Sequence, residues 1–261
     1  MLNVEKINDL LKEKNIAVPR ITHYSLTDST NERAKVYALE HPEDTSPAVF
    51  IADEQSAGRG RRGRSFVSNR GAGIYISLLI HPRSEGFDAA RITAKAAVAL
   101  ARATENIAKV RTDIKWVNDL YLGGKKLAGI LVEGAMSKEG KTPYVIVGMG
   151  INVYKNAISE EISNIATSIE SETNLRVSRE ALAAEIISEF FLTADKMSED
   201  IVYKEYRSRS FVIGRFVTVM KISESYEATV LDLQNDYSLL LRKHNGETES
   251  LFTGEVSLKL Y

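Results

Sequence analysis

The segment from residue 114 to residue 148 constrains the fold most, because its pattern is one of short strands joined by turns. The glycine pair Gly123-Gly124 between two apolar runs is typical of a tight hairpin. Strands joined by hairpins run in opposite directions, so this segment predicts an antiparallel sheet. The expected strands lie around Trp116 and at residues 120–122, 125–133 and 144–148, with a loop at 138–141.

Helices and further strands are predicted around this segment. Ser29 and Glu32 form the pattern of a capping box, in which Ser29 accepts from the backbone and Glu32 reaches back. The Ala-rich stretch 88–109 suits a helix packed closely on a sheet. The chain is therefore expected to be an α+β protein, with packed helices on a mixed, largely antiparallel sheet. Other helices are expected at 4–11, 178–196 and 203–209, and other strands at 48–52 and 73–80.

The pattern changes at residue 212, where short alternating strands replace the mixture of helices and strands. Turns around 235–236 and 245–246 separate these strands. A run of about fifty residues of this kind predicts a small all-β module, plausibly a barrel. We expect two domains, residues 1–211 and 212–261. The strands of the second are expected at 216–220, 227–233, 238–242 and 249–252.

The overall charge is nearly balanced, but its distribution is not. The chain carries 34 Lys and Arg against 35 Asp and Glu, which gives a net charge of −1 and argues against a polyanionic partner. Four arginines nevertheless fall within residues 58–64. Without them the rest of the chain would carry −1 − 4 = −5. One concentrated cationic loop therefore belongs to a mildly acidic protein.

The chain has no cysteine, which excludes disulfides, thiolate nucleophiles and a thioester on the enzyme. Residues 1–14 are amphipathic and charged, unlike a signal peptide, and no apolar run reaches the roughly 18 residues of a membrane span. We therefore expect a cytoplasmic protein. Only 28 residues precede Ser29, which leaves no room for a helix-turn-helix DNA-binding domain.

Residues 58–64 read Gly-Arg-Gly-Arg-Arg-Gly-Arg and give the strongest functional signal. Glycines let the backbone approach a ligand, and guanidinium groups offer paired donors that match carboxylate or phosphate. Because four like charges repel, we expect the loop to be mobile without an anion and ordered by a ligand. A solvated basic loop and an arginine-rich RNA contact are the alternatives. The position between two apolar strands favours a small-anion site.

A second signal is Lys126, at the end of an apolar strand. Regular alternation would place Lys126 on one face with Ala128 and Ile130. The side chain then either extends to water or points into a pocket, where Gly129 would allow close approach of a ligand. Trp116, nearby, is a residue type found more often in a core than in a ligand platform.

Other chemical motifs are weak or absent. Residues 148–150 form Gly-x-Gly at the end of a strand, but the third glycine of a dinucleotide fingerprint is missing. The four histidines are far apart without ligand-like spacing, so no metal-ligating residues are predicted.

Taken together, five motifs in their order along the chain resemble the biotin–protein ligase family. They are residues 28–31, 55–64, 115–119, 126–133 and 148–152. Residues 253–258 are similar to the end of that family's SH3-like C-terminal domain. The resemblance implies a fold like that of class II aminoacyl-tRNA synthetases, in a ligase-only form without the DNA-binding domain.

The resemblance also implies roles for individual residues. Catalytic roles fall to Lys126, Arg59, Arg61 and Asp119. Biotin contacts fall to Ser29, Thr30, Asn31, Gln55, Gly58, Arg59, Gly60, Arg61, Lys126 and Gly129. Contacts to ATP fall to Arg61, Arg62, Trp116, Asn118 and Asn152. Lys259 stands where the family often has an arginine near the nucleotide.

The implied reaction is ATP-dependent activation of biotin to biotinyl-5'-AMP, with Mg²⁺ on the phosphates, followed by transfer to a lysine. The implied partner is the biotin carboxyl carrier domain of a carboxylase, and a homodimer is a further expectation. The alternatives are a lipoate–protein ligase or octanoyltransferase, which resemble the same fold, and an RNA-binding module that uses the arginine loop.

Overall fold

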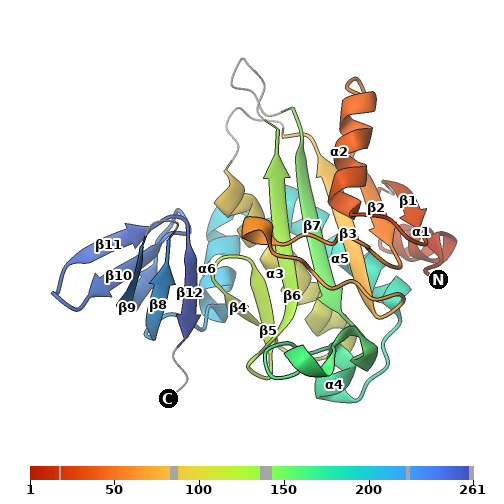
Figure 1. Cartoon of the computed structure of the whole chain (residues 1–261). Coiled ribbons are helices and arrows are strands. Elements are labelled where there is room, and N and C mark those ends of the chain that lie inside the picture. Colours follow the sequence, from red (N-terminus) through yellow and green to blue (C-terminus); the bar gives the residue numbers. More distant parts are fainter. Residues whose placement is uncertain (18, 83–87, 136–142, 222–223, 259–261) are drawn as a thin grey trace.

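The computed structural model describes residues 1–17, 19–82, 88–135, 143–221 and 224–258. Its larger part is built on a seven-stranded sheet (Figure 1) of order β1-β2-β3-β7-β6-β5-β4. Strands β1 and β2 are parallel and every other neighbouring pair is antiparallel, which confirms the predicted mixed, largely antiparallel sheet. The strands are β1 (Arg20–Tyr24), β2 (Ala48–Ala52), β3 (Gly73–Ile80), β4 (Asp113–Lys115), β5 (Asp119–Leu122), β6 (Lys125–Gly134) and β7 (Val145–Asn152). The expected loop at 138–141 and Lys259 lie outside the described residues.

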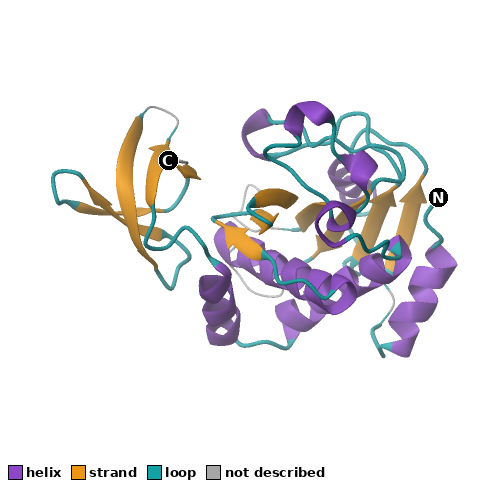
Figure 2. Ribbon diagram, turned by 90° about the horizontal axis from the view of Figure 1, so that it is seen from below, coloured by secondary structure: helices purple, strands orange, loops and turns teal. Residues whose placement is uncertain are grey.

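Helices cover the two faces of this sheet unequally. Helices α3 and α5 pack against each other on one face, α1 packs on α5, and α2 lies on the opposite face against β2, β3 and β7 (Figures 1 and 2). The face with α2 is therefore the one left partly open. The helices are α1 (Val4–Glu13), α2 (Thr30–Glu40), α3 (Ala89–Ala108), α4 (Ile169–Thr173), α5 (Arg179–Asp195) and α6 (Glu199–Arg209), with short 3-10 turns η1 (Arg61–Gly63), η2 (Lys155–Ala157) and η3 (Glu160–Ile162).

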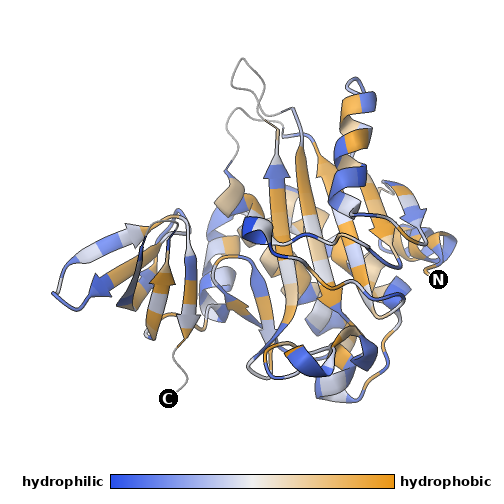
Figure 3. Ribbon diagram, viewed as in Figure 1, coloured by the Kyte–Doolittle hydropathy of each residue, from blue (hydrophilic) through white to orange (hydrophobic). Residues whose placement is uncertain are grey.

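The apolar residues follow the predicted periodicity. Figure 3 shows hydrophobic colour along the central strands and hydrophilic colour on η1, which crosses in front of them. Helix α3 buries mostly alanines, whose small side chains allow close packing on the sheet. Asp88 caps this helix by accepting from Ala90 and Arg91, so its start agrees with the sequence pattern.

The start of α2 differs from the predicted capping box. Ser29 is the N-cap residue, but its side chain makes no capping hydrogen bond. Instead Gln55 Oε1 accepts from the backbone N–H of Thr30 at 2.8 Å, and Glu32 binds Arg59. The helix terminus faces residues 58–64, here called the Gly/Arg loop, rather than solvent. Hydrogen-bond partners from other elements therefore replace the local capping bonds.

The hairpin of β5 and β6 contains a bulge that changes which face Lys126 occupies. Leu120 pairs with Ala128, but the next residue, Tyr121, pairs with Lys126, so one residue of β6 is extra. A Cβ added to Gly129 would lie 3.4 Å from Lys126 Nζ, whereas Ala128 is buried in the core. The prediction that Lys126 shares a face with Ala128 is therefore wrong, because a bulge interrupts the two-residue period.

A second, five-stranded antiparallel sheet of order β11-β10-β9-β8-β12 follows α6. All four predicted strands are present, together with a fifth at the end. They are β8 (Phe216–Met220), β9 (Ser225–Leu233), β10 (Leu239–Lys243), β11 (Thr248–Leu251) and β12 (Glu255–Leu258). The exact domain division at residue 211 stays a prediction. No helix in the described ranges is long and apolar enough to cross a membrane.

Helix α6 and the turn between β9 and β10 hold the segment that leads into β5. Trp116 donates its indole N–H to the carbonyl of Tyr237 at 2.8 Å, and Tyr206 donates to the carbonyl of Val117 at 2.9 Å. Trp116 is only 3% exposed. These two contacts together fix the segment immediately before Asn118 and Asp119.

Candidate functional site

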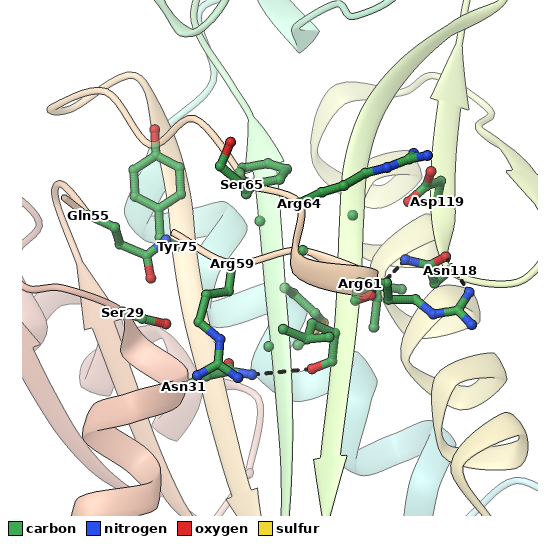
Figure 4. Close-up of a pocket in the computed structure, with 18 of the residues that line it drawn as sticks. Ser29, Asn31, Gln55, Arg59, Arg61, Arg64, Ser65, Tyr75, Asn118 and Asp119 are labelled. Carbon is green, nitrogen blue, oxygen red and sulfur yellow. Dashed lines mark hydrogen bonds between the residues drawn. The ribbon is translucent and has the colours of Figure 1, made fainter. Parts of the chain in front are cut away.

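A cavity lies on the open face of the large sheet, beneath the Gly/Arg loop (Figure 4). Its floor comes from β3, β6 and β7, and one wall comes from the start of α2. Segments far apart in the sequence meet here, as the motif pattern predicts. The predicted site residues in its lining are Ser29, Thr30, Asn31, Gln55, Arg59, Gly60, Arg61, Asn118, Asp119, Lys126 and Gly129.

Two glycines of β7 make room on the floor of this cavity. They are two residues apart, so both face the same side of the sheet. A Cβ at Gly148 would lie 2.2 Å from Asn31 Oδ1, and one at Gly150 would lie 2.6 Å from the ring of Phe66. In the neighbouring strand β6, Gly129 pairs with Gly150. The Gly-x-Gly of this chain thus lets side chains pack on a strand rather than cradling a phosphate.

The end of the cavity near α2 is lined mainly by neutral side chains that are densely hydrogen bonded. Gln55 Oε1 accepts from the N–H and the hydroxyl of Thr30, and Gln55 Nε2 donates to Ser68 at 2.8 Å. The buried hydroxyl of Ser77 lies 2.7 Å from Thr30 Oγ1 and 2.6 Å from Asn31 Oδ1. These partners fix the direction of each donor and acceptor, which suits a neutral polar group such as an amide or urea.

The opposite end of the cavity is cationic. Lys126 Nζ lies 2.7 Å from Asp119 Oδ1, and Arg61 donates to Asn118 Oδ1 at 3.2 Å. Burial, followed by the charge of neighbouring Arg62, lowers the pKa of the Arg61 guanidinium. Among the residues that the structure describes, Arg61 has no carboxylate in hydrogen-bonding contact. A partly buried guanidinium with no carboxylate in hydrogen-bonding contact, in the same cavity as Lys126, is suited to binding an anion.

Arg59 does not belong to this cationic end. Its guanidinium binds Glu32 of α2 and Glu133 of β6, and Figure 4 shows its side chain reaching down beside Asn31. A guanidinium already held by two carboxylates is a poor stabiliser of charge on a phosphate. The geometry therefore gives no support to the predicted catalytic role of Arg59, although Arg59 does line the cavity.

The remaining arginines of the loop also have partners within the chain. Arg64 forms an ion pair with Glu255 of β12 at 2.6 Å, and Arg62 donates to the carbonyl of Met220 at 3.1 Å. Repulsion among the loop's arginines, the basis for expecting a mobile loop, is therefore offset by groups from other elements. Ordering of the loop by a ligand stays a prediction.

Four of the predicted binding residues lie outside the lining of the cavity. Trp116 is buried with its indole N–H satisfied, which argues against the predicted contact with ATP. Asn152, also buried, donates to the carbonyl of Thr167 at 3.1 Å. Gly58 is packed so closely that an added Cβ would lie 2.3 Å from the carbonyl oxygen of Phe66. Arg62, the fourth residue, donates to the carbonyl of Met220 instead.

Other residues of the site were not predicted. Tyr75 lines the cavity from β3 and Glu255 reaches it from β12, while the buried Ser77 supports Thr30 and Asn31 from β3. Two-residue alternation within the strand at 73–80 indicates that Tyr75 and Ser77 share a face, but not which face. No local signal places Glu255 beside a loop that lies almost two hundred residues away in the sequence.

Comparison with known proteins shows which class of protein has this fold and site. Residues 24–152, which carry most of the cavity, match the Biotin/lipoate A/B protein ligase family. The biotin protein ligase from Aquifex aeolicus, solved in complex with biotin and ATP, superposes with a TM-score of 0.78 at 26% identity, over 92% of this chain and 98% of that chain. The fold is therefore that of the biotin and lipoate ligases.

Two curated relatives narrow the class. The bifunctional ligase/repressor BirA of Escherichia coli is 30% identical over 263 residues, which cover 99% of this chain and 78% of that protein. The protein of the same name from Bacillus subtilis is 29% identical over 91% of this chain and 74% of its own length. The chain belongs to the biotin protein ligase family.

Proposed function

We propose that this protein is a biotin–protein ligase that activates biotin with ATP to form biotinyl-5'-AMP and transfers biotin to a lysine of a carboxylase's biotin carboxyl carrier domain. The observation that carries this proposal is the polarity of the cavity, which is neutral and hydrogen bonding at one end and cationic at the other. Biotin has the same polarity, with an uncharged ureido ring at one end and a carboxylate at the other.

This polarity assigns an orientation to biotin. The ureido ring would lie against Ser29, Thr30 and Gln55, whose hydrogen-bonding directions are fixed by their neighbours. The carboxylate would extend over Gly129 toward Lys126 and Arg61. Reversing the ligand would place its carboxylate near Glu32 and Glu133, so the charges oppose that orientation.

In the first step an oxygen of the biotin carboxylate attacks the α-phosphorus of ATP, and the bond to the pyrophosphate oxygen breaks. Bringing two anions to 4 Å costs about 4 kcal/mol per charge pair at an effective dielectric constant of about 20. Lys126 and Arg61 lie where they can offset this repulsion and the charge that spreads in the transition state. Asp119, which contacts Lys126, holds the ammonium group in place.

In the second step the amine of an acceptor lysine attacks the acyl carbonyl of biotinyl-5'-AMP, an amide forms and AMP leaves. The intermediate is a mixed anhydride that water can hydrolyse. The Gly/Arg loop covers the cavity, so it can exclude water while the intermediate waits for the acceptor.

Mg²⁺ is proposed to arrive with the phosphates of ATP and to neutralise part of their charge. Within the described ranges no group of three or more His, Asp or Glu side chains is arranged to hold a metal ion. Mg²⁺ is commonly bound by one or two carboxylates together with substrate phosphates, and this chain offers Asp119 at the cationic end.

The rival functions make different demands. Lipoate has a carboxylate but no ureido ring, so it would leave the hydrogen-bonding end of the cavity unused. RNA binding would need the loop's arginines to be free to pair with phosphates, whereas Arg59 and Arg64 are engaged by carboxylates of the same chain. A cytoplasmic location and a homodimer are also part of this proposal.

The test is exchange of labelled pyrophosphate into ATP, measured with biotin, with lipoate and without either acid. Exchange that depends on biotin is expected, and exchange with lipoate alone would refute the assignment. Labelling of a purified carrier domain, against the same domain with its acceptor lysine replaced by arginine, tests the transfer step.

A further inference from the structure

Arg59 ties the Gly/Arg loop to two elements, α2 beside the cavity and β6 in its floor. One nitrogen of its guanidinium binds Glu32 on α2, and another binds Glu133 on β6. The loop is therefore attached to both α2 and β6 through a single side chain; Figure 4 shows that side chain extending toward Asn31.

Glu133 connects this attachment to the floor of the cavity. Its Oε1 binds Arg59, while its Oε2 accepts from Asn31 Nδ2 at 2.7 Å. Asn31 Oδ1 in turn lies 2.6 Å from the buried hydroxyl of Ser77 on β3. A continuous line of polar contacts thus runs from the buried floor, through a residue proposed to bind the ureido end of biotin, to the loop above.

The surroundings indicate that these ion pairs hold the loop rather than take part in the chemistry. The side chains of Arg59, Glu32 and Glu133 are 39%, 31% and 33% exposed, so water only partly screens them. Two carboxylates on one guanidinium leave a net charge of −1, which would repel the biotin carboxylate. The reacting end of the cavity, marked by Lys126 and Arg61, is separate from this cluster.

We propose that Glu32 and Glu133 are positioning residues that anchor the Gly/Arg loop over the cavity through Arg59 and thereby slow the escape of biotinyl-5'-AMP. Glu133 also holds Asn31. Binding of the ureido ring at Asn31 and closure of the loop therefore depend on the same carboxylate. The consequence for the intermediate rests on the proposed function, whereas the anchoring of the loop does not.

The experiment compares Glu133→Gln, Glu32→Gln and the double variant with the parent and with Glu54→Gln. Glu54 is a matched control, because its side chain is 34% exposed and pairs with Arg70 at 2.7 Å outside the cavity lining. The rate at which labelled biotinyl-5'-AMP dissociates is measured by dilution into unlabelled biotin. Adenylate formation at saturating biotin and ATP is measured separately.

Each single substitution is expected to speed dissociation about tenfold, because a charged hydrogen bond becomes a neutral one. Adenylate formation at saturation should stay within about twofold of the parent, and Glu54→Gln should resemble the parent in both assays. In the Arg59→Gln background, Glu32→Gln should add little, because both changes break the same contact. Parent-like dissociation in all variants, or slower adenylate formation with unchanged dissociation, would overturn the proposal.

A second measurement needs no biotin and so separates this proposal from the function. Trypsin cleaves after arginine, and the loop contains four of them within residues 58–64. In the ligand-free protein, Glu133→Gln and Glu32→Gln should be cut faster in the loop than the parent and Glu54→Gln. If the parent shows no biotin-dependent pyrophosphate exchange, the proposed function fails, while cleavage at equal rates would refute the anchor by itself.

Discussion

Replacing Gly148 by alanine tests whether the floor of the cavity needs a glycine. The added Cβ would lie 2.2 Å from Asn31 Oδ1, and the three heavy atoms nearest to it all belong to Asn31. Because β7 is a central strand, the backbone cannot move away easily, so the amide of Asn31 must be displaced. Its contact with Ser77 at 2.6 Å and its hydrogen bond to Glu133 at 2.7 Å would then break.

The size of the effect follows from those two interactions. A neutral hydrogen bond contributes about 1 kcal/mol and one to a carboxylate about 1.5–3 kcal/mol. Their loss is partly recovered by water, so about 2 kcal/mol remains, which corresponds to a rise of roughly 30-fold in the KM for biotin. The unfolded chain loses entropy in a Gly→Ala change, which offsets about 0.4–1 kcal/mol of this loss, so the free energy of unfolding should fall by about 1–1.6 kcal/mol.

A double-mutant cycle tests whether the clash with Asn31 causes the effect of Gly148→Ala. Asn31→Ala removes the atoms that clash, so adding Gly148→Ala to Asn31→Ala should change the KM by less than about twofold. The KM is measured by pyrophosphate exchange for the parent, both single variants and the double variant. A parent-like KM in Gly148→Ala would refute the reasoning, as would a double variant whose loss equals the product of the two single losses.

Substitutions at three further residues test the cationic end and its support. In rapid-quench assays, Lys126→Ala should slow adenylate formation about a hundredfold, or about 2.7 kcal/mol, and Lys126→Arg should slow it less. An unchanged rate of pyrophosphate release in Lys126→Ala would contradict the role of Lys126. Arg61→Ala should weaken retention of biotinyl-5'-AMP, measured by filter binding, and retention equal to that of the parent would count against it. Trp116→Phe should lower the free energy of unfolding by about 1–2 kcal/mol, because the carbonyl of Tyr237 loses a buried donor. Denaturant unfolding measures that change, while the KM for biotin should stay the same, and a large rise in the KM for ATP would restore the predicted nucleotide contact of Trp116.

Local sequence patterns were sufficient for most of the secondary structure. The hairpin at Gly123-Gly124 and the alanine-rich helix starting after Asp88 depend on neighbours in the chain, which a sequence displays directly. The parallel pairing of β1 with β2 was not predicted, because the partners are 28 residues apart and no turn joins them. Pairing between strands that no turn joins depends on how all the strands of the sheet pack together.

The site shows the same division between local and distant effects. Residues of the familiar motifs meet in one cavity, but the face on which Lys126 lies depends on a bulge that regular alternation cannot reveal. The partners of Arg59 were missed because Glu133 is 74 residues away. Ser29 was assigned a cap that Gln55 provides instead, since a buried helix terminus takes whichever acceptor the fold supplies.

The charge of the Gly/Arg loop acquires a different meaning once its partners are known. Four arginines in seven residues suggest a surface that attracts anions, yet Arg59 and Arg64 are neutralised by carboxylates from α2, β6 and β12. Their charges therefore fasten the loop, and under the proposed function Arg61 is left to act with Lys126 on the ligand. A loop built in this way would close over one small carboxylate and one nucleotide, but it would offer little to an extended polyanion. Selectivity for a small ligand thus arises less from how many arginines the loop carries than from how many of them the rest of the chain has already bound.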